Sequence, residues 1–212
     1  MALAAFGAIG SVQAGAIVSA TSATINSGGP GFGSINDTLN QNGLNSGYVS
    51  GVTDFDTYIG SNPSHSSQFS GFEWFSNQGS SSASVTYNLG SSMSINAVAL
   101  WNEEAAGIGS LNLLYSTDGI NFTSLASNLN PTDNPPFPAP YFADVFAFGA
   151  VTAQYIRFDA SACPQQPAGF DSCAIGEVAF RQGNAVPEPS SAALAGFALL
   201  MAGAARRRAL RA

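Results

Sequence analysis

The sequence predicts an all-β protein, an antiparallel jelly-roll β-sandwich, from three observations. Short stretches of alternating or continuous apolar residues recur along the middle of the chain. Turn signals such as Asp118-Gly119 separate these stretches. No stretch between residues 15 and 185 has a helical period with capping residues. Short strands at regular spacing with turns between them are typical of a sandwich.

Seven predicted strands follow one another: "SVTYNLG" (residues 84–90), "INAVALW" (95–101), "SLNLLYS" (110–116), "INFTSLA" (120–126), "YFADVFAF" (141–148), "AQYIRFDA" (153–160) and "CAIGEVAF" (173–180). The first alternates and ends in a turn glycine, Gly90, whereas the second is the nearly continuous apolar run of a central strand. The third and fourth flank the turn Thr117-Asp118-Gly119, which predicts a hairpin.

The composition allows one folded domain with terminal segments and excludes one class of partner. The chain has 212 residues, of which 45% are hydrophobic, which is too apolar for a disordered protein. It has no lysine, and residues 15–185 contain two arginines against twelve acidic residues, a net charge of −10. Such a domain repels phosphate backbones, so no nucleic-acid partner is expected. Its negative electrostatic potential favours a cationic ligand or a metal ion.

The two cysteines, Cys163 and Cys173, lie ten residues apart. In the cell envelope they would form a disulfide, whose short loop contributes about 2–3 kcal/mol. Two free thiols in a cytosolic protein are the alternative. A zinc site is disfavoured, because two further ligands are missing and His65 is the only histidine.

The first residues predict a secretory signal peptide over residues 1–14, ending at the small-residue site Val12-Gln13-Ala14. The basic segment that precedes the apolar part of such signals is absent, so we expect that the signal is truncated at its start. The alternative is a buried apolar segment of the mature fold.

The C-terminal segment, residues 186–212, predicts a single transmembrane helix over residues 190–205. These sixteen uncharged residues would span roughly 24 Å as a helix. Arg206, Arg207 and Arg208 follow directly, and they act as a membrane stop that keeps this end cytoplasmic. An extended Pro-Glu-Pro segment precedes the helix at Pro187, Glu188 and Pro189.

This segment resembles the PEP-CTERM sorting signal of Gram-negative bacteria. The resemblance rests on Val186-Pro187-Glu188-Pro189, the apolar helix and the arginine cluster, in that order. It implies export through the Sec translocon, a transient anchor in the inner membrane, and removal of the tail by an exosortase. The mature protein would then lie at the cell surface or in the extracellular matrix. An ordinary membrane anchor is the alternative.

The domain between residues 15 and 185 resembles the discoidin-like family (coagulation factor type C, galactose-binding-like), which includes many carbohydrate-binding modules. The resemblance covers residues 50–181 and rests on five pieces in the family's order: "VTYNLG", "AVALWNEE", "LLYSTDGINFTSL", "AQYIRFDA" and "AIGEVAF". In the first, Asn88 replaces the family's usual aspartate. The resemblance implies a jelly-roll sandwich and a carbohydrate ligand.

Two carboxylates, Asp54 and Asp56, are candidate ligands of a hard cation such as Ca²⁺. In the discoidin-like family, a loop at this place and the glutamate of the closing strand share a structural calcium. The resemblance therefore adds Glu177 to the predicted metal site. Phe55 stands where the family's loop has a small residue. A solvated polar turn is the alternative.

The predicted ligand-binding residues are Trp101, Asn102, Glu103 and Glu104. An exposed aromatic face with amides and carboxylates beside it suits a sugar. A core position for Trp101 is the alternative, and Trp74 is expected in the core. Glu103 and Glu104 are neighbours in an extended chain, so they would point to opposite faces and could not flank one glycosidic bond.

These observations predict an exported, non-enzymatic surface or extracellular protein whose sandwich binds carbohydrate or extracellular polysaccharide. Two alternatives stay open. One is a purely structural biofilm or surface protein without a ligand site, which a buried Trp101 with no groove beside it would favour. The other is a hydrolase acting on exopolysaccharide, which requires two carboxylates that face each other across a cleft.

Overall fold

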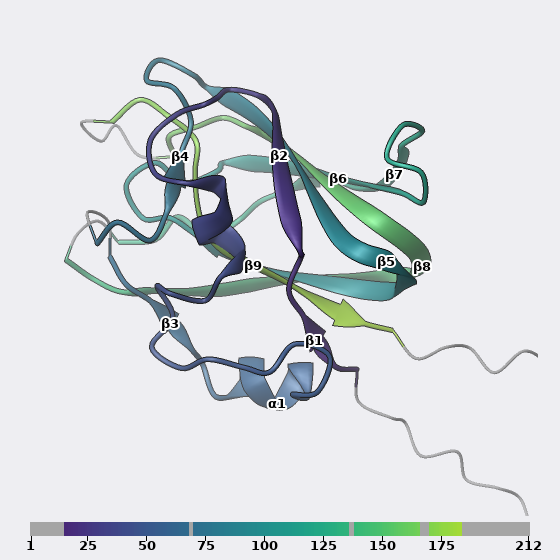
Figure 1. The fold of residues 1–212 in the computed structure, drawn as a ribbon. Coiled ribbons are helices and arrows are strands. Elements are labelled where there is room, and N and C mark those ends of the chain that lie inside the picture. The colour runs from purple at the N-terminus through teal and green to yellow at the C-terminus, as the bar shows by residue number, and fades with distance from the viewer. Residues whose placement is uncertain (1–14, 68–69, 136–137, 166–169, 184–212) are drawn as a thin grey trace, which may run out of the picture.

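The computed structural model describes residues 15–67, 70–135, 138–165 and 170–183. The predicted signal peptide, Pro-Glu-Pro motif, transmembrane helix and arginine cluster lie outside these residues. The elements, in chain order, are β1 (Ile17–Val18), β2 (Ser22–Ser27), η1 (Ile35–Leu39), α1 (Phe55–Gly60), β3 (Ser64–His65), β4 (Trp74–Phe75), β5 (Ser82–Asn102), β6 (Ser110–Ser116), β7 (Thr123–Leu129), β8 (Tyr141–Ser161) and β9 (Ala174–Gln182) (Figure 1).

Two long strands, β5 and β8, run through both layers of the sandwich. They pair antiparallel from Ser82 with Ser161 to Trp101 with Ala143, and the register shifts between Asn88 and Met93. An irregularity of this kind bends a strand and increases its twist. The sequence predicts two separate strands at each of these places. The structure joins each pair into one bent strand. In β5, Gly90, with φ of +85°, continues the chain instead of reversing it.

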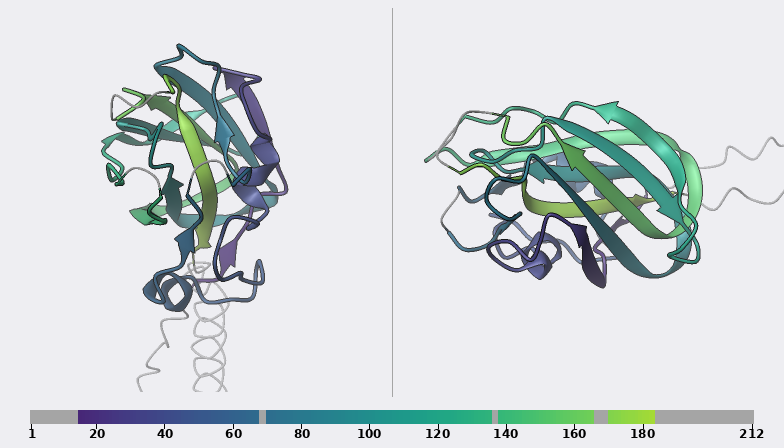
Figure 2. Two further views of the ribbon diagram at one scale, coloured as in Figure 1. Left: turned by 90° about the vertical axis from the view of Figure 1, so that its left-hand side faces the viewer. Right: turned by 90° about the horizontal axis from the view of Figure 1, so that it is seen from above.

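The remaining strands extend the two halves of this bent pair. In the first layer, β2 pairs with the first half of β5, and β6 and β7 extend the sheet beyond the second half of β8. In the second layer, β9 pairs with the second half of β5, β1 and β4 pair with β9, and β3 pairs with β8. Figure 2 shows the two layers from the side and from above. Every strand pair is antiparallel, and the predicted all-β sandwich is confirmed.

The main core lies between the layers and follows the period of two in the strands. Val85, Tyr87 and Leu89 of β5 point into it, whereas Thr86 and Asn88 between them are half-buried on the outer face. The second half of β5 is buried on both faces, as its continuous apolar run predicts.

The outer face of the second layer is covered by residues 41–67. Ala97, Ala99 and Trp101 of β5 pack there against Phe55 and Tyr58 of α1. The sequence predicts no helix here, and α1 departs from that prediction. A helix of six residues is too short to show a period, and its signal is the cap: Asp54 Oδ1 accepts a hydrogen bond from Thr57 N at 2.7 Å.

Cys163 and Cys173 form the predicted disulfide. The bond closes a ten-residue loop, and the loss of chain entropy in the unfolded state stabilises the fold by about 3 kcal/mol. Cys173 also lies next to β9, and its N–H donates to Ser76 Oγ at 2.8 Å. The disulfide therefore fixes the loop before β9 to the end of the sandwich.

The two described chain ends lie side by side. Ile17 pairs with Arg181 and Val18 with Phe180, so β1 and β9 bring residues 15 and 183 to one end of the domain (Figure 1). Within the four described ranges, no helix is long and apolar enough to cross a membrane.

Candidate ligand-binding site

The structure does not place the predicted ligand residue Trp101 at the surface. Its side chain is fully buried between β5 and the covering segment, and its Nε1–H donates to the carbonyl oxygen of Pro63 at 2.9 Å. The expectation of an exposed Trp101 was wrong because both faces of "INAVALW" are covered. One face packs in the main core, and the other, which carries Trp101, packs under the covering segment. Trp74 is buried as expected, and its Nε1–H donates to Pro30 O at 2.9 Å.

Asn102 is also buried and has a structural role. Its Oδ1 accepts from Ile108 N at 2.8 Å, and its Nδ2 donates to Thr132 O at 3.0 Å and to Gln165 Oε1 at 2.9 Å. One amide therefore ties together three loops at the end of the sandwich. Its donors and acceptor are used by the protein itself, so it is not available to a ligand.

Glu103 and Glu104 are buried and point toward each other, not to opposite faces. Strand β5 ends at Asn102, and the chain then curls so that the two side chains share a hydrogen bond. Glu103 Oε2 also accepts from Ala105 N at 2.8 Å and from Ala106 N. Burial, with the charge of Glu104, raises the pKa of Glu103 to about 8.

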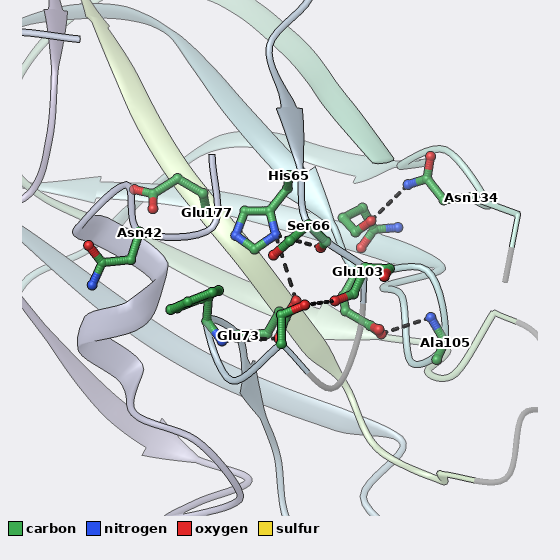
Figure 3. Close-up of polar contacts among 12 residues, drawn as sticks. Asn42, His65, Ser66, Glu73, Glu103, Ala105, Asn134 and Glu177 are labelled. Atoms are coloured by element: carbon green, nitrogen blue, oxygen red, sulfur yellow. Dashed lines mark hydrogen bonds and ion pairs between the residues drawn. The ribbon is translucent and has the colours of Figure 1, made fainter. Parts of the chain in front are cut away.

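Figure 3 shows His65, Glu73 and Glu103 directed toward one another at this end. His65 Nδ1–H donates to Ser66 O at 2.9 Å and lies 3.7 Å from Glu73 Oε1. Burial lowers the pKa of His65 to about 4 and raises the pKa of Glu73 to about 7, so near neutral pH the ring is uncharged and this contact is not an ion pair.

A buried acidic group, defined as His65, Glu73, Glu103, Glu104 and Tyr141, packs closely around two rings. The His65 and Tyr141 rings stack at 4.9 Å. A Cβ added at position 43 would overlap the His65 ring, and one at position 176 would overlap the Tyr141 hydroxyl. The glycines there let the backbone close directly over both rings.

The predicted calcium ligands are not brought together. Asp54 caps α1, Asp56 Oδ1 pairs with Arg181 Nη1 at 2.9 Å, and Glu177 Oε2 accepts from Gln41 N at 2.8 Å. Asp56 is exposed, whereas Glu177 is fully buried, and burial raises its pKa to about 8. In the described part of the chain, no group of three or more His, Cys, Asp or Glu side chains is arranged to hold a metal ion. As a set, these three carboxylates do not fit a calcium site.

An open cleft of about 210 Å³ lies on the outer face of the first layer. Its floor is polar and comes from β2 and β5: Ser22, Thr24, Asn26, Thr86 and Asn88. The register brings these residues together, because Ser22 pairs with Asn88 and Thr24 with Thr86, and directly paired residues share one face. Asn26 Nδ2 donates to Thr86 Oγ1 at 2.8 Å, which orients its amide.

The wall of the cleft is formed by β8 and the turn between β6 and β7, the predicted hairpin, which is confirmed. Gly119, with φ of +74°, lies against Tyr155, where an added Cβ would stand 3.2 Å from the ring. The Arg157 guanidinium covers the Phe122 ring, 4.7 Å from its centroid. The turn therefore folds over the sheet and makes a raised edge beside the polar floor.

Arg157 is paired within the protein. Its Nη2 donates to Asp159 Oδ2 at 3.0 Å, and Asp159 Oδ1 accepts from Ser84 Oγ at 2.6 Å. The alternation in "AQYIRFDA" predicts this face, with Tyr155, Arg157 and Asp159 outward, and Ile156 and Phe158 are buried on the other side. The cleft was not predicted, because β2 alternates over only six residues, with Ala23 and Ile25 as its apolar positions, and its pairing with β5 lies outside any local pattern.

A second surface feature is an aromatic patch formed by Phe32, Phe75 and Phe170. The Phe170 ring lies edge-on to Phe32 at 6.1 Å and to Phe75 at 5.5 Å. Phe32 is 71% exposed. The patch includes Phe75 of β4 and consists of apolar rings, whereas the floor of the cleft is polar.

Comparison with known proteins identifies one family. The F5/8 type C domain matches residues 52–174. Among curated proteins, none matches the chain. A chitosan-binding module of a chitosanase/glucanase from Paenibacillus sp. IK-5 is 23% identical over 77% of this chain and 95% of its own, with a TM-score of 0.49. A pectin-binding module is 17% identical over 80% and 96%, with a TM-score of 0.45.

Proposed function

We propose that this protein, which belongs to the F5/8 type C domain family, is an exported, non-catalytic module that binds carbohydrate in the cleft between β2, β5, β8 and the β6–β7 turn. The observation that carries the proposal is the lining of the cleft. Hydroxyl and amide groups of the floor can both donate to and accept from sugar hydroxyls. Tyr155 and Phe122 add aromatic surface to the lining, against which the C–H groups of a sugar can pack.

The cleft suits a surface-bound polymer better than an enclosed small molecule. It is open to solvent, and its lining comes from the three neighbouring strands β2, β5 and β8. A saccharide chain lying along this surface would meet polar side chains at every second residue of each strand. This repetition supports binding of an extended glycan such as an extracellular polysaccharide.

Export and processing are part of the same proposal. The protein would be exported by Sec, held in the inner membrane by residues 190–205 and released or transferred by an exosortase at Val186–Pro189, with residues 15–185 as the exported domain. The pairing of β1 with β9 supports this order, because it brings the two described chain ends, residues 15 and 183, to one end of the domain. Surface or extracellular localisation follows from this route.

The burial of Trp101 favours the purely structural alternative, because a buried side chain cannot contact a ligand. The residues that line the cleft, which do not include Trp101, would supply the ligand contacts instead. For the hydrolase alternative, the carboxyl pair Glu103–Glu104 is enclosed and hydrogen-bonded internally. Such a pair lacks the intervening space that a glycosidic bond requires.

A bulky side chain in the cleft should abolish binding. In Thr24→Trp, the indole would fill the floor of the cleft from an exposed position on β2, and we expect affinity for a bound glycan to fall at least tenfold, about 1.4 kcal/mol. Isothermal titration of the full-length chain against a panel of soluble polysaccharides measures this. Ser27→Trp, also exposed on β2 but outside the lining, is the matched control.

A substitution in the aromatic patch tests whether the patch is the binding surface instead. Phe32→Ala removes its most exposed ring and should leave binding unchanged. If Phe32→Ala abolishes binding and Thr24→Trp does not, the patch and not the cleft is the binding surface. If no polysaccharide binds the unmodified chain, the proposed function is wrong.

Calcium binding stays a prediction from the family resemblance. Glu177 Oε1 is buried and has no hydrogen-bond partner among the described residues. Asp54 and Asp56 do not form a metal-binding group with it in the described part of the chain. Comparing the melting temperature in Ca²⁺ and in EDTA, with Glu177→Gln beside the unmodified chain, tests it.

A further inference from the structure

We infer that Asp159 sets the charge selectivity of the cleft: it cancels the charge of Arg157, so that the cleft takes uncharged saccharides and rejects acidic ones. This inference rests on the proposed function. Arg157 is the only basic residue among those that line the cleft. An unpaired arginine at a glycan site would recognise a uronate carboxylate through two parallel hydrogen bonds.

Arg157 already has two contacts within the protein, to Asp159 and to Phe122. Its Nη2 is engaged by Asp159 Oδ2 at 3.0 Å, and one face of its guanidinium lies on the Phe122 ring, 4.7 Å from the centroid. The side chains of Arg157 and Asp159 are 30% and 34% exposed, so the pair is partly shielded from solvent. An incoming carboxylate would have to displace Asp159 or stand directly beside it.

Asp159 is held in this position from its other side. Its Oδ1 accepts from Ser84 Oγ at 2.6 Å, and Ser84 Oγ in turn lies 3.2 Å from the donor Asn26 Nδ2. Asn26 belongs to the floor of the cleft. A chain of hydrogen bonds therefore runs from the sugar-facing amide to the carboxylate that faces Arg157. A carboxylate with both oxygens engaged does not swing away to admit a competing anion.

The surrounding charges act in the same direction. Asp118 lies in the turn that forms the wall and is fully exposed, so the cleft carries a second negative charge near its rim. Residues 15–185 have a net charge of −10, which repels polyanions over a distance of about 8–10 Å at ordinary salt. Arg157 is the one group that would favour an acidic glycan, and Asp159 removes that preference.

A cationic glycan has no acidic partner among the residues that line the cleft, so the net charge of −10 attracts it only non-specifically and in a salt-dependent way. Both oxygens of Asp159 already accept hydrogen bonds, and the rest of the lining is uncharged apart from Arg157. The remaining donors and acceptors are hydroxyl and amide groups, which pair with neutral hydroxyls. The ligand class that this surface fits is therefore an uncharged polysaccharide.

The test compares three soluble polymers on the full-length oxidised chain: a neutral glucan or galactan panel, a polyuronate and chitosan, at 50 and 200 mM NaCl. We expect a neutral polymer to bind with little dependence on salt, and no measurable binding of the polyuronate. Asp159→Asn keeps the shape of the side chain and an oxygen for Ser84 but removes the charge. It should increase affinity for the polyuronate at least tenfold, and this gain should shrink at 200 mM NaCl.

Asp171→Asn is the matched control, because it removes an exposed negative charge outside the cleft lining and should not change polyuronate binding. The inference is overturned if the unmodified chain binds the polyuronate as tightly as any neutral polymer, or if it binds chitosan as tightly as any neutral polymer at 200 mM NaCl, where non-specific charge attraction is weakened. It is also overturned if folded Asp159→Asn, with a melting temperature close to that of the unmodified chain, gains no polyuronate binding. If neither chain binds any of the polymers, the proposed function itself fails together with the inference.

Discussion

Raising the pH from 6 to 9 should lower the free energy of unfolding of this protein by several kcal/mol. Burial raises the pKa of Glu73 to about 7 and the pKa values of Glu103 and Glu177 to about 8, from an ordinary value of 4.5. In the folded protein these carboxyl groups keep their protons at pH values where the unfolded chain has released them. The folded state then binds more protons, so stability is full below pH 4.5 and is lost as the pH passes 7 to 8.

Glu177 alone corresponds to a loss of about 3 kcal/mol between pH 6 and pH 9, at about 1.4 kcal/mol per pKa unit. His65 acts in the opposite direction at lower pH. Its pKa is lowered by burial to about 4, so its contribution is lost as the pH falls below 6.5. The two effects together place the maximum of stability in mildly acidic solution.

Urea unfolding at pH 5, 6, 7, 8 and 9 in EDTA measures this profile. In Glu177→Gln, an uncharged amide replaces the titrating group, and the decrease from pH 6 to pH 9 should become smaller while stability at pH 9 exceeds that of the unmodified chain. Asp171→Asn, on the surface, should leave the profile unchanged. A flat profile from pH 6 to pH 9 would contradict the burial of these protonated carboxyl groups.

Trp101→Ala should lower the free energy of unfolding by about 3–5 kcal/mol. The substitution removes the largest side chain between β5 and the covering segment and leaves a cavity against Phe55 and Ala99. It also leaves the Pro63 carbonyl without the indole N–H that it accepts from at 2.9 Å. Chemical denaturation followed by circular dichroism measures the loss, since fluorescence changes with the tryptophan itself.

Two further substitutions separate the causes of this loss. Trp101→Phe retains part of the buried ring and loses the hydrogen bond, so it should fall between the unmodified chain and Trp101→Ala. Phe32→Ala removes an aromatic ring that is 71% exposed and should cost less than about 1 kcal/mol. Equal stability of Trp101→Ala and the unmodified chain would mean that the indole is at the surface, as the sequence first suggested.

The strands from β5 onward lie where the sequence predicted strands, because these segments carry their own apolar patterns, whereas β1 to β4 were not predicted. Val85, Tyr87 and Leu89 alternate with polar residues, and the Asp118-Gly119 turn lies between two β-rich stretches, so β5, β6 and β7 follow from local pattern alone. The bend within β5 could not be predicted, because a glycine with positive φ, here Gly90, fits a bulge in one strand as well as a turn between two.

The candidate site could not be predicted from local sequence patterns, for a different reason. Trp101 and the residues after it looked accessible because the segment that covers them, residues 41–67, has almost no periodic apolar signal. The cleft joins Ser22 and Thr24 to Thr86, Asn88 and Tyr155, which the strand register alone brings together. Such a surface forms when strands that are distant in the sequence pair with each other, and no local periodicity in a single sequence shows which strands pair.

Strand β9 has a mechanical consequence for a protein held by its C-terminal end. It is hydrogen-bonded along most of its length to β5, the strand that passes through both layers, and its other edge holds only the short β1 and β4. Tension applied at Gln182 would therefore be resisted in shear by the β5–β9 hydrogen bonds, which lie across the pulling direction. The same tension applied between the two adjacent chain ends would peel β1 away first and leave the body of the sandwich intact.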